Sequence, residues 1–281
     1  MKMKKILFSI FLTLISLSVF SQWTWQNPLP QGNSLHSVYF SDSITGYAVG
    51  ECGTIIKTND GGATWTILSS GTTNSLRSVW FTDANTGYVV GGIGTILKTI
   101  NGGAKWNTEL SGTSNWLYSI YFTDSNVGYA VGSHGTILKT INGGITWTAL
   151  ASGTNNSLFS VYFKDDYTGY VVGDNGTILK TINGGINWTI LSSGTTTPLQ
   201  SVYFPATKIG YVVGGYINVD YASGIILKTI DGGITWTALL SGTTNLLMSV
   251  YFTDIKTGYG VGAGGTMLKT INGGGYCYPM K

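Results

Sequence analysis

Small and bulky side chains alternate along this chain in short runs that are typical of β-strands. Residues 76–81 read Leu-Arg-Ser-Val-Trp-Phe, and a second run at 88–90 follows a turn that contains aspartate and glycine. A third run covers 95–99, and a fourth covers 106–113. Aspartate can hydrogen-bond nearby backbone amides and glycine takes positive φ, so both suit the turns between strands. The pattern therefore predicts a unit of four short strands.

This unit occurs six times. Each copy has a threonine at the end of its third strand. These threonines are 41 residues apart except for one spacing of 48, and they are Thr58, Thr99, Thr140, Thr181, Thr229 and Thr270. Strand-rich repeats with a period of 40–45 residues are the signature of a β-propeller. We expect an all-β fold, a six-bladed β-propeller of four-stranded antiparallel blades, over residues 22–281.

The two ends of the chain complement each other in this pattern. The sixth copy stops after residues 272–274 without a clear fourth strand, whereas residues 23–27 resemble a fourth strand and have no blade of their own. We expect the N-terminal strand to complete the last blade and close the ring, which removes exposed sheet edges.

Residues 1–21 have the features of a cleavable signal peptide. Lys2, Lys4 and Lys5 precede an apolar stretch at 6–20, which is shorter than a membrane span normally requires. Cleavage would leave Gln22 as the first residue. We expect a secreted, periplasmic or cell-surface protein with no membrane span after cleavage.

Composition excludes several classes of function. The 15 basic residues face 12 acidic ones, and three lysines lie in the leader, so the mature chain is close to neutral. Such a chain, with Arg77 as its sole arginine, is a poor nucleic-acid binder. Cys52 and Cys277 form no disulfide framework; free thiols are expected, and a bridge between them stays open. No histidine–cysteine cluster has metal-ligand spacing, so we expect no metal and no cofactor. We also expect the protein to be a monomer.

A hairpin motif recurs between the third and fourth strands. Residues 58–65 read Thr-Asn-Asp-Gly-Gly-Ala-Thr-Trp and match the Asp-box pattern S/T-x-D-x-G-x-T-W. Aspartate or asparagine can accept backbone N–H groups there, glycine supplies positive φ, and tryptophan can bury its ring between blades. We interpret the motif as structural, with these residues: Asp60, Asn101, Asn142, Asn183, Asp231 and Asn272, and Trp65, Trp106, Trp147, Trp188 and Trp236.

Together with Gly-Tyr-Val-Val-Gly and Gly-Thr-Ile-Leu-Lys-Thr, these motifs make residues 25–274 resemble the photosystem II assembly and stability factor family, within the wider bacterial neuraminidase repeat and sortilin-like class. The resemblance implies a propeller, seven-bladed in the photosynthetic factors, that binds a protein partner and catalyses no reaction. The six repeats and the single arginine depart from that family, in which a basic patch is expected. We therefore expect a secreted relative with a partner other than the photosystem.

Asp-box propellers include enzymes, so catalysis has to be tested against the residues. Sialidases resemble one another in using three arginines to bind a carboxylate, which Arg77 alone cannot provide. Other glycosidases need two facing carboxylates. Glu51, Asp174 and Asp220 lie in the second turns of their repeats and are the candidates for such a pair.

Differences between the six copies indicate where a partner would bind. The second residue of each first strand varies, and so does the second turn, and strand alternation places both at one end of the blades. The second turn of the fifth copy is longer and contains two tyrosines, and aromatic side chains are favoured at interfaces. The predicted binding residues are His36, Glu51, Arg77, Trp116, Tyr118, His134, Phe159, Asp174, Gln200, Tyr216, Asp220 and Tyr221.

These observations predict a secreted, non-enzymatic binding or scaffolding propeller with a protein or peptide partner. The alternative is a carbohydrate-active protein, either lectin-like or a divergent glycoside hydrolase, that uses the same end of the blades.

Overall fold

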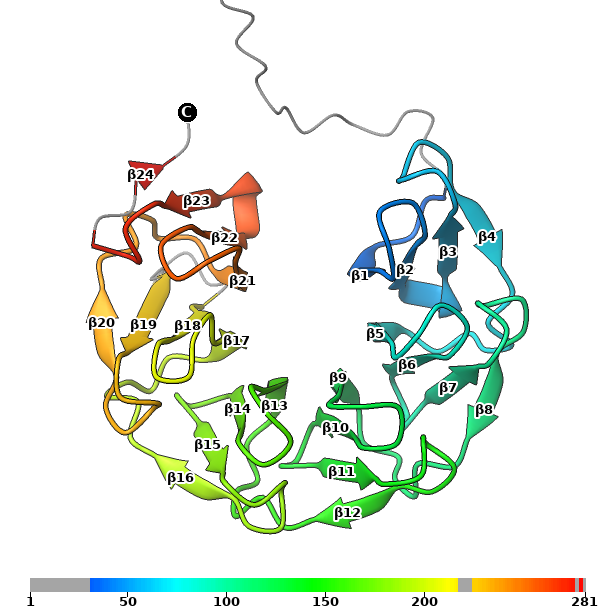
Figure 1. Cartoon of the computed structure of the whole chain (residues 1–281), viewed down its shortest axis with the longest axis horizontal. Helices are drawn as coiled ribbons and strands as arrows, with labels where there is room; N and C mark the ends of the chain where they lie inside the picture. Colours follow the sequence, from blue (N-terminus) through cyan, green and yellow to red (C-terminus); the bar gives the residue numbers. More distant parts are fainter. Residues whose placement is uncertain (1–30, 217–223, 276–277, 280–281) are drawn as a thin grey trace, which may run out of the picture.

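The computed structural model describes residues 31–216, 224–275 and the backbone of 278–279. Six four-stranded antiparallel sheets follow one another around a central axis as blades one to six (Figure 1). The predicted all-β six-bladed propeller is thus confirmed. The leader, residues 23–27, Asp220, Tyr221 and Cys277 lie outside the described residues. Within the described part of the chain, no helix is long and apolar enough to cross a membrane.

Each blade uses its four strands in chain order from the axis outward. The innermost strands are β1 (Leu35–Phe40), β5 (Leu76–Phe81), β9 (Leu117–Phe122), β13 (Leu158–Phe163), β17 (Leu199–Tyr203) and β21 (Leu247–Phe252). The second strands are β2 (Gly46–Gly50), β6 (Gly87–Gly91), β10 (Gly128–Gly132), β14 (Gly169–Gly173), β18 (Gly210–Gly214) and β22 (Gly258–Gly262).

The outer half of each blade is built in the same way. The third strands are β3 (Ile55–Thr58), β7 (Ile96–Thr99), β11 (Ile137–Thr140), β15 (Ile178–Thr181), β19 (Ile225–Thr229) and β23 (Met267–Thr270). The outermost strands are β4 (Thr66–Leu68), β8 (Asn107–Glu109), β12 (Thr148–Leu150), β16 (Thr189–Leu191), β20 (Thr237–Leu239) and β24 (Tyr278–Pro279). Short 3₁₀ turns, η1 (Glu51–Gly53) and η2 (Ala263–Gly265), follow β2 and β22.

The sixth blade differs from the sequence prediction. Its outermost strand is β24, which pairs antiparallel with β23 through Lys269 opposite Tyr278. The prediction that residues 23–27 fill this position is therefore wrong. Two backbone pairs are enough for β24 to occupy the edge of β23, although the sequence around it lacks the repeat pattern.

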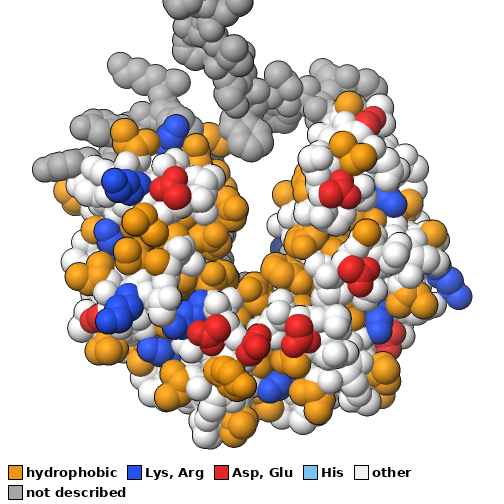
Figure 2. Space-filling view, viewed as in Figure 1, with side chains coloured by type: hydrophobic (Ala, Val, Ile, Leu, Met, Phe, Trp, Pro, Cys, Tyr) orange, Lys and Arg blue, Asp and Glu red, His pale blue; other side chains and the backbone are white. Residues whose placement is uncertain are grey.

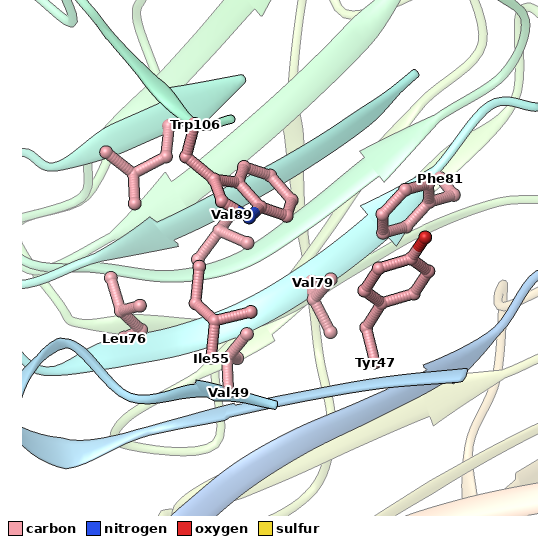
Figure 3. Packing of buried hydrophobic residues seen from close by; sticks show 9 residues of the cluster. Tyr47, Val49, Ile55, Leu76, Val79, Phe81, Val89 and Trp106 are labelled. Carbon is pink, nitrogen blue, oxygen red and sulfur yellow. The ribbon is translucent and has the colours of Figure 1, made fainter. Parts of the chain in front are cut away.

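The hydrophobic core lies between the blades rather than within them. The second strands of the inner blades are sandwiched by neighbouring blades, so all five residues of β6 are buried, whereas β22 of blade six is partly exposed. Between blades one and two, Tyr47 and Val49 of β2 pack against Val79 and Phe81 of β5, with Trp106 beside them (Figure 3). Four further clusters, each again with a tyrosine, a phenylalanine and aliphatic side chains, join the remaining neighbours through to blade six.

Candidate functional site

Backbone hydrogen bonds place the variable loops at one end of the blades. The turn after each second strand bonds to the connection that precedes the first strand, as when the Gly92 amide donates to the Ser75 carbonyl at 2.8 Å. The hairpin loops between third and fourth strands bond to the first turns instead, as when Gly102 donates to Asn85 at 2.9 Å. The two sets of loops lie at opposite ends, as predicted. We call the end with the variable loops the rim.

The variable residue of each first strand occupies a β-bulge. The pairing between first and second strands shifts by one residue at this point, for example between Leu76 and Ser78. A bulge leaves its extra residue outside the ladder and re-aims its side chain. The six bulge residues are His36, Arg77, Tyr118, Phe159, Gln200 and Met248.

Four predicted residues form a continuous row along the rim, which we call the cation–aromatic row. The Arg77 guanidinium carbon lies 5.2 Å from the centre of the Trp116 ring, within cation–π range. The Trp116 and Tyr118 ring centres are 6.3 Å apart, and those of Tyr118 and Phe159 are 5.5 Å apart. The row crosses blades two, three and four, so three repeats contribute to one surface.

Arg77 keeps unused hydrogen-bonding capacity in this row. Its Nε is buried without an acceptor, and no residue in the described chain accepts a hydrogen bond from its guanidinium. Gly92 leaves the space that Trp116 fills, because a Cβ at Gly92 would lie 3.3 Å from the indole ring. Arg77 and Trp116 therefore bring a cation with unused hydrogen-bond donors and a large apolar ring together at the rim.

Charged groups flank the row at both ends. His36 Nε2 lies 3.6 Å from Glu51 Oε1. Burial and the charge of Arg77 lower the pKa of His36, against the opposing effect of Glu51, so this imidazole is neutral at pH 7. Burial raises the pKa of Asp174. Next to the row, the described residues thus provide one fixed cation, the neutral His36 and the two acids Glu51 and Asp174.

The other predicted residues lie on the rim without a described contact to the row. Gln200 is half-buried at its bulge, and His134 is exposed on the second turn of blade three. The Tyr216 hydroxyl donates to the Thr196 carbonyl at 3.2 Å. Asp220 and Tyr221 belong to the part of the fifth-blade loop outside the described residues.

Left-handed backbone marks the second turns of blades one to four. Cys52, Ile93, His134 and Asn175 have φ between 53° and 55°, and Gly264 occupies the same place in blade six. Positive φ is costly for a β-branched residue such as Ile93. Cys52, at one of these positions, is an exposed free thiol. Residues in strained turns of this kind occur often at binding sites.

At the end opposite the rim, the recurrent hairpin loops have a structural role. The Thr64 amide and hydroxyl donate to the two carboxylate oxygens of Asp60 at 2.8 and 2.6 Å. These bonds, with one from the Thr58 hydroxyl, lower the pKa of Asp60 to about 2. Asn101 accepts the Lys105 amide in the same way at 2.9 Å. The loop needs an oxygen acceptor rather than a charge.

Sequence reasoning missed one set of contacts that recurs at every described junction. The tyrosine of a second strand and the lysine of the adjacent third strand donate to one glycine carbonyl in the next blade. In blade two these donors are Tyr88 and Lys98, and their distances to the Gly143 oxygen are 2.8 and 2.6 Å. A lysine at the same place in all six third strands was the signal that could have revealed the contact.

Comparisons with solved structures show what the fold is similar to. YCF48 from Cyanidioschyzon merolae is 22% identical, with a TM-score of 0.73, over 90% of this chain and 87% of that one. YCF48 bound to D1 peptide is 19% identical, with a TM-score of 0.50, over 87% and 93% of the two chains. The GH74 enzyme of Niastella koreensis is 18% identical, with a TM-score of 0.70, over 85% of this chain and 45% of that enzyme.

Sequence comparisons add the family. None of the curated protein sequences compared with the chain matches it. The family model described as photosynthesis system II assembly factor YCF48 matches residues 16–107 and 109–244, which is most of the sequence. The chain therefore belongs to the YCF48 family of photosystem II assembly factor-like propellers.

Proposed function

We propose that this protein is a secreted, non-enzymatic propeller that binds a protein or peptide partner on its rim. The observation that carries the proposal is the cation–aromatic row, in which Arg77, Trp116, Tyr118 and Phe159 touch one another across three blades. Tryptophan, tyrosine and arginine are the residues that most often dominate protein interfaces. A YCF48 structure with a bound D1 peptide supports peptide binding by a propeller of this family.

The chemistry of the row defines the kind of segment that would fit. The three aromatic rings offer flat apolar surface to side chains of the partner. The Arg77 guanidinium has donors for a backbone carbonyl or a carboxylate. Because Arg77 is the one fixed cation in the row, we expect a largely apolar segment with a single acceptor group opposite it, rather than a strongly acidic peptide.

Peptide display against the mature protein, starting at Gln22, tests this function. Selected peptides should bind Trp116→Ala and Arg77→Gln at least about ten-fold more weakly than the unchanged protein, because both substitutions remove interface anchors. Ile141→Ala is the matched control, since Ile141 is an exposed side chain on a hairpin loop away from the rim. Urea unfolding should show that all three variants are folded. Equal binding by the unchanged protein and the rim variants would contradict the proposal.

The secreted location has its own measurement. Sequencing the exported protein should give Gln22 as its first residue, because cleavage after Ser21 follows from the leader pattern. A chain that stays inside the cell with Met1 intact would contradict this part of the proposal.

A carbohydrate ligand is the second candidate. Stacked aromatic rings also suit sugars, and the GH74 enzyme of Niastella koreensis shares the fold. A glycan array with the unchanged protein and Trp116→Ala distinguishes the two ligands. Binding of glycans through Trp116, together with no selected peptide, would favour the carbohydrate function.

A further inference from the structure

Asp174 lies at the blade-four end of the cation–aromatic row. Gly173, the residue before it, pairs with β13 at the point where the bulge places Phe159 outside the ladder. The Asp174 side chain is half-buried there. The acid therefore stands at the Phe159 end of the row, whereas Arg77 stands at the Trp116 end.

Tyr118, in the middle of the row, is influenced by both charges. Burial raises the pKa of its hydroxyl, the positive charge of Arg77 opposes that effect, and the negative charge of Asp174 adds to it. The row and its neighbour Asp174 together form a bipolar surface, because a cation lies at one end, an acid lies at the other, and three aromatic rings lie between them.

No lysine or arginine of the described chain lies within salt-bridge distance of the Asp174 carboxylate. Two ion pairs occur among the described residues, His36 with Glu51 and Lys164 with Asp165. Burial raises the pKa of Asp174, because desolvation penalises the charged form, and a hydrogen bond from Ser157 offsets part of that effect. A half-buried carboxylate in this situation is stabilised when a binding partner brings a cation to it.

The surface between the two charges is apolar. In the six innermost strands, all of which are described, Arg77 is the only lysine, arginine, aspartate or glutamate. Figure 2, which views the molecule down its short axis, shows hydrophobic side chains along the inner edge of the blades. Charges beside an apolar surface interact more strongly than charges in open water, because the local dielectric constant is lower. A ligand therefore gains most by placing one acceptor and one cation at the two ends of the row.

We propose that the rim binds a segment of the partner protein that carries a lysine or arginine side chain, and that the Asp174 carboxylate receives this cation. The inference rests on the proposed function, since it names the chemistry of the peptide that the cation–aromatic row would bind. Apolar side chains of the segment would lie on the three rings, and a carbonyl or carboxylate would face Arg77.

The length of the row limits where the cation lies in such a segment. The two steps between ring centres along the row measure 6.3 and 5.5 Å. An extended chain advances roughly 3.3 Å per residue, so about four residues cover these steps. The basic residue should therefore lie within about five residues of the group that faces Arg77.

Peptide display with two matched libraries tests the inference. Both contain short linear peptides, and in the second library glutamine replaces every lysine and arginine. The bait is the unchanged protein starting at Gln22. We expect binders from the first library, with a basic residue at a recurrent position, and few or none from the second.

Charge removal on each side of the ion pair then assigns the contact. Asp174→Asn keeps an oxygen that can accept the Ser157 hydroxyl, and it should weaken binding of a selected peptide at least about ten-fold. Glutamine in place of the peptide's basic residue should cause a similar loss without altering the protein. The glutamine peptide should bind the unchanged protein and Asp174→Asn equally, because both losses report one ion pair. Asp166→Asn, which removes an exposed acid at the opposite end of the same blade, is the matched control and should bind normally.

The other outcomes distinguish this inference from the proposed function. An Asp174→Asn loss that is just as large for the glutamine peptide would overturn the inference, because Asp174 would then only support the structure of its turn. Selected peptides that need Trp116 but bind Asp174→Asn normally would overturn it and leave the proposed function in place. Failure of both libraries to yield any binder that depends on Trp116 would overturn the two together.

Discussion

At the scale of single residues, the contact of Tyr88 and Lys98 with the Gly143 carbonyl ties blade two to blade three. Tyr88→Phe removes one of the two donors, and we expect it to lower the free energy of unfolding by about 0.5–1.5 kcal/mol. Tyr259→Phe is the matched control, because no acceptor for Tyr259 is present among the described residues; its effect should be close to zero. Urea unfolding followed by tryptophan fluorescence measures both. Equal losses in the two variants would contradict the prediction.

Single residues also show why the sequence indicated which side chains lie on the rim but not which of them contact one another. His36, Arg77, Tyr118 and Phe159 were identified because their position varies among copies that are otherwise alike. The stacking of Arg77 on Trp116 could not be inferred, since it depends on a bulge in one blade and a connection leading into the next. Spacing within a repeat carries no information about contacts between repeats.

At the scale of one strand, β22 contains a glycine where other blades have valine or alanine. Gly260 corresponds to Val89 and Ala130, and it borders a pocket of about 30 Å³ between blades five and six. A Cβ there would have Leu268 as its nearest neighbour, at 3.9 Å. Gly260→Val should raise the free energy of unfolding by about 1–2 kcal/mol, because it fills apolar space and restricts the unfolded chain.

Gly258, in the same strand, is the control for this prediction. A Cβ at Gly258 would lie 2.4 Å from the Phe252 ring, so Gly258→Ala should destabilise the protein by about 1–3 kcal/mol. Thermal unfolding of the two variants measures the difference. Stabilisation by both, or by neither, would show that the packing of blade six differs from that described.

The strand pattern was predictable because alternation and turn residues act locally. Residues 76–81 form β5 over the same bounds that the pattern gave, and the first-turn aspartates accept backbone amides, as when Asp83 accepts the Thr86 amide at 2.8 Å. The outermost strand of blade six was not predictable. Tyr278 and Pro279 lie opposite Lys269 and Leu268 in the ladder with β23, although the sequence around them lacks the repeat pattern.

At the scale of the whole molecule, six similar repeats indicate a propeller without defining how its first and last blades meet. The periodicity of the sequence gives the number of blades. The rotation between one blade and the next depends on how the two blades pack together, which the periodicity does not determine. The exposure of Phe40, and the absence of a described acceptor for Tyr259 and its neighbour Lys269, could be seen only in the packed structure. A repeat protein whose ends do not pack on each other should behave as a linear array, with stability set by neighbour contacts.

That behaviour gives the last prediction. Blades one and six each have one described neighbour, whereas blades three and four have two, so opening an end blade breaks one junction instead of two. Hydrogen exchange followed by mass spectrometry should therefore be faster in β2 and β22 than in β10 and β14. Uniform exchange in all six blades of the free protein would mean that the first and last blades already share a junction, and the opening between them would then be closed in solution.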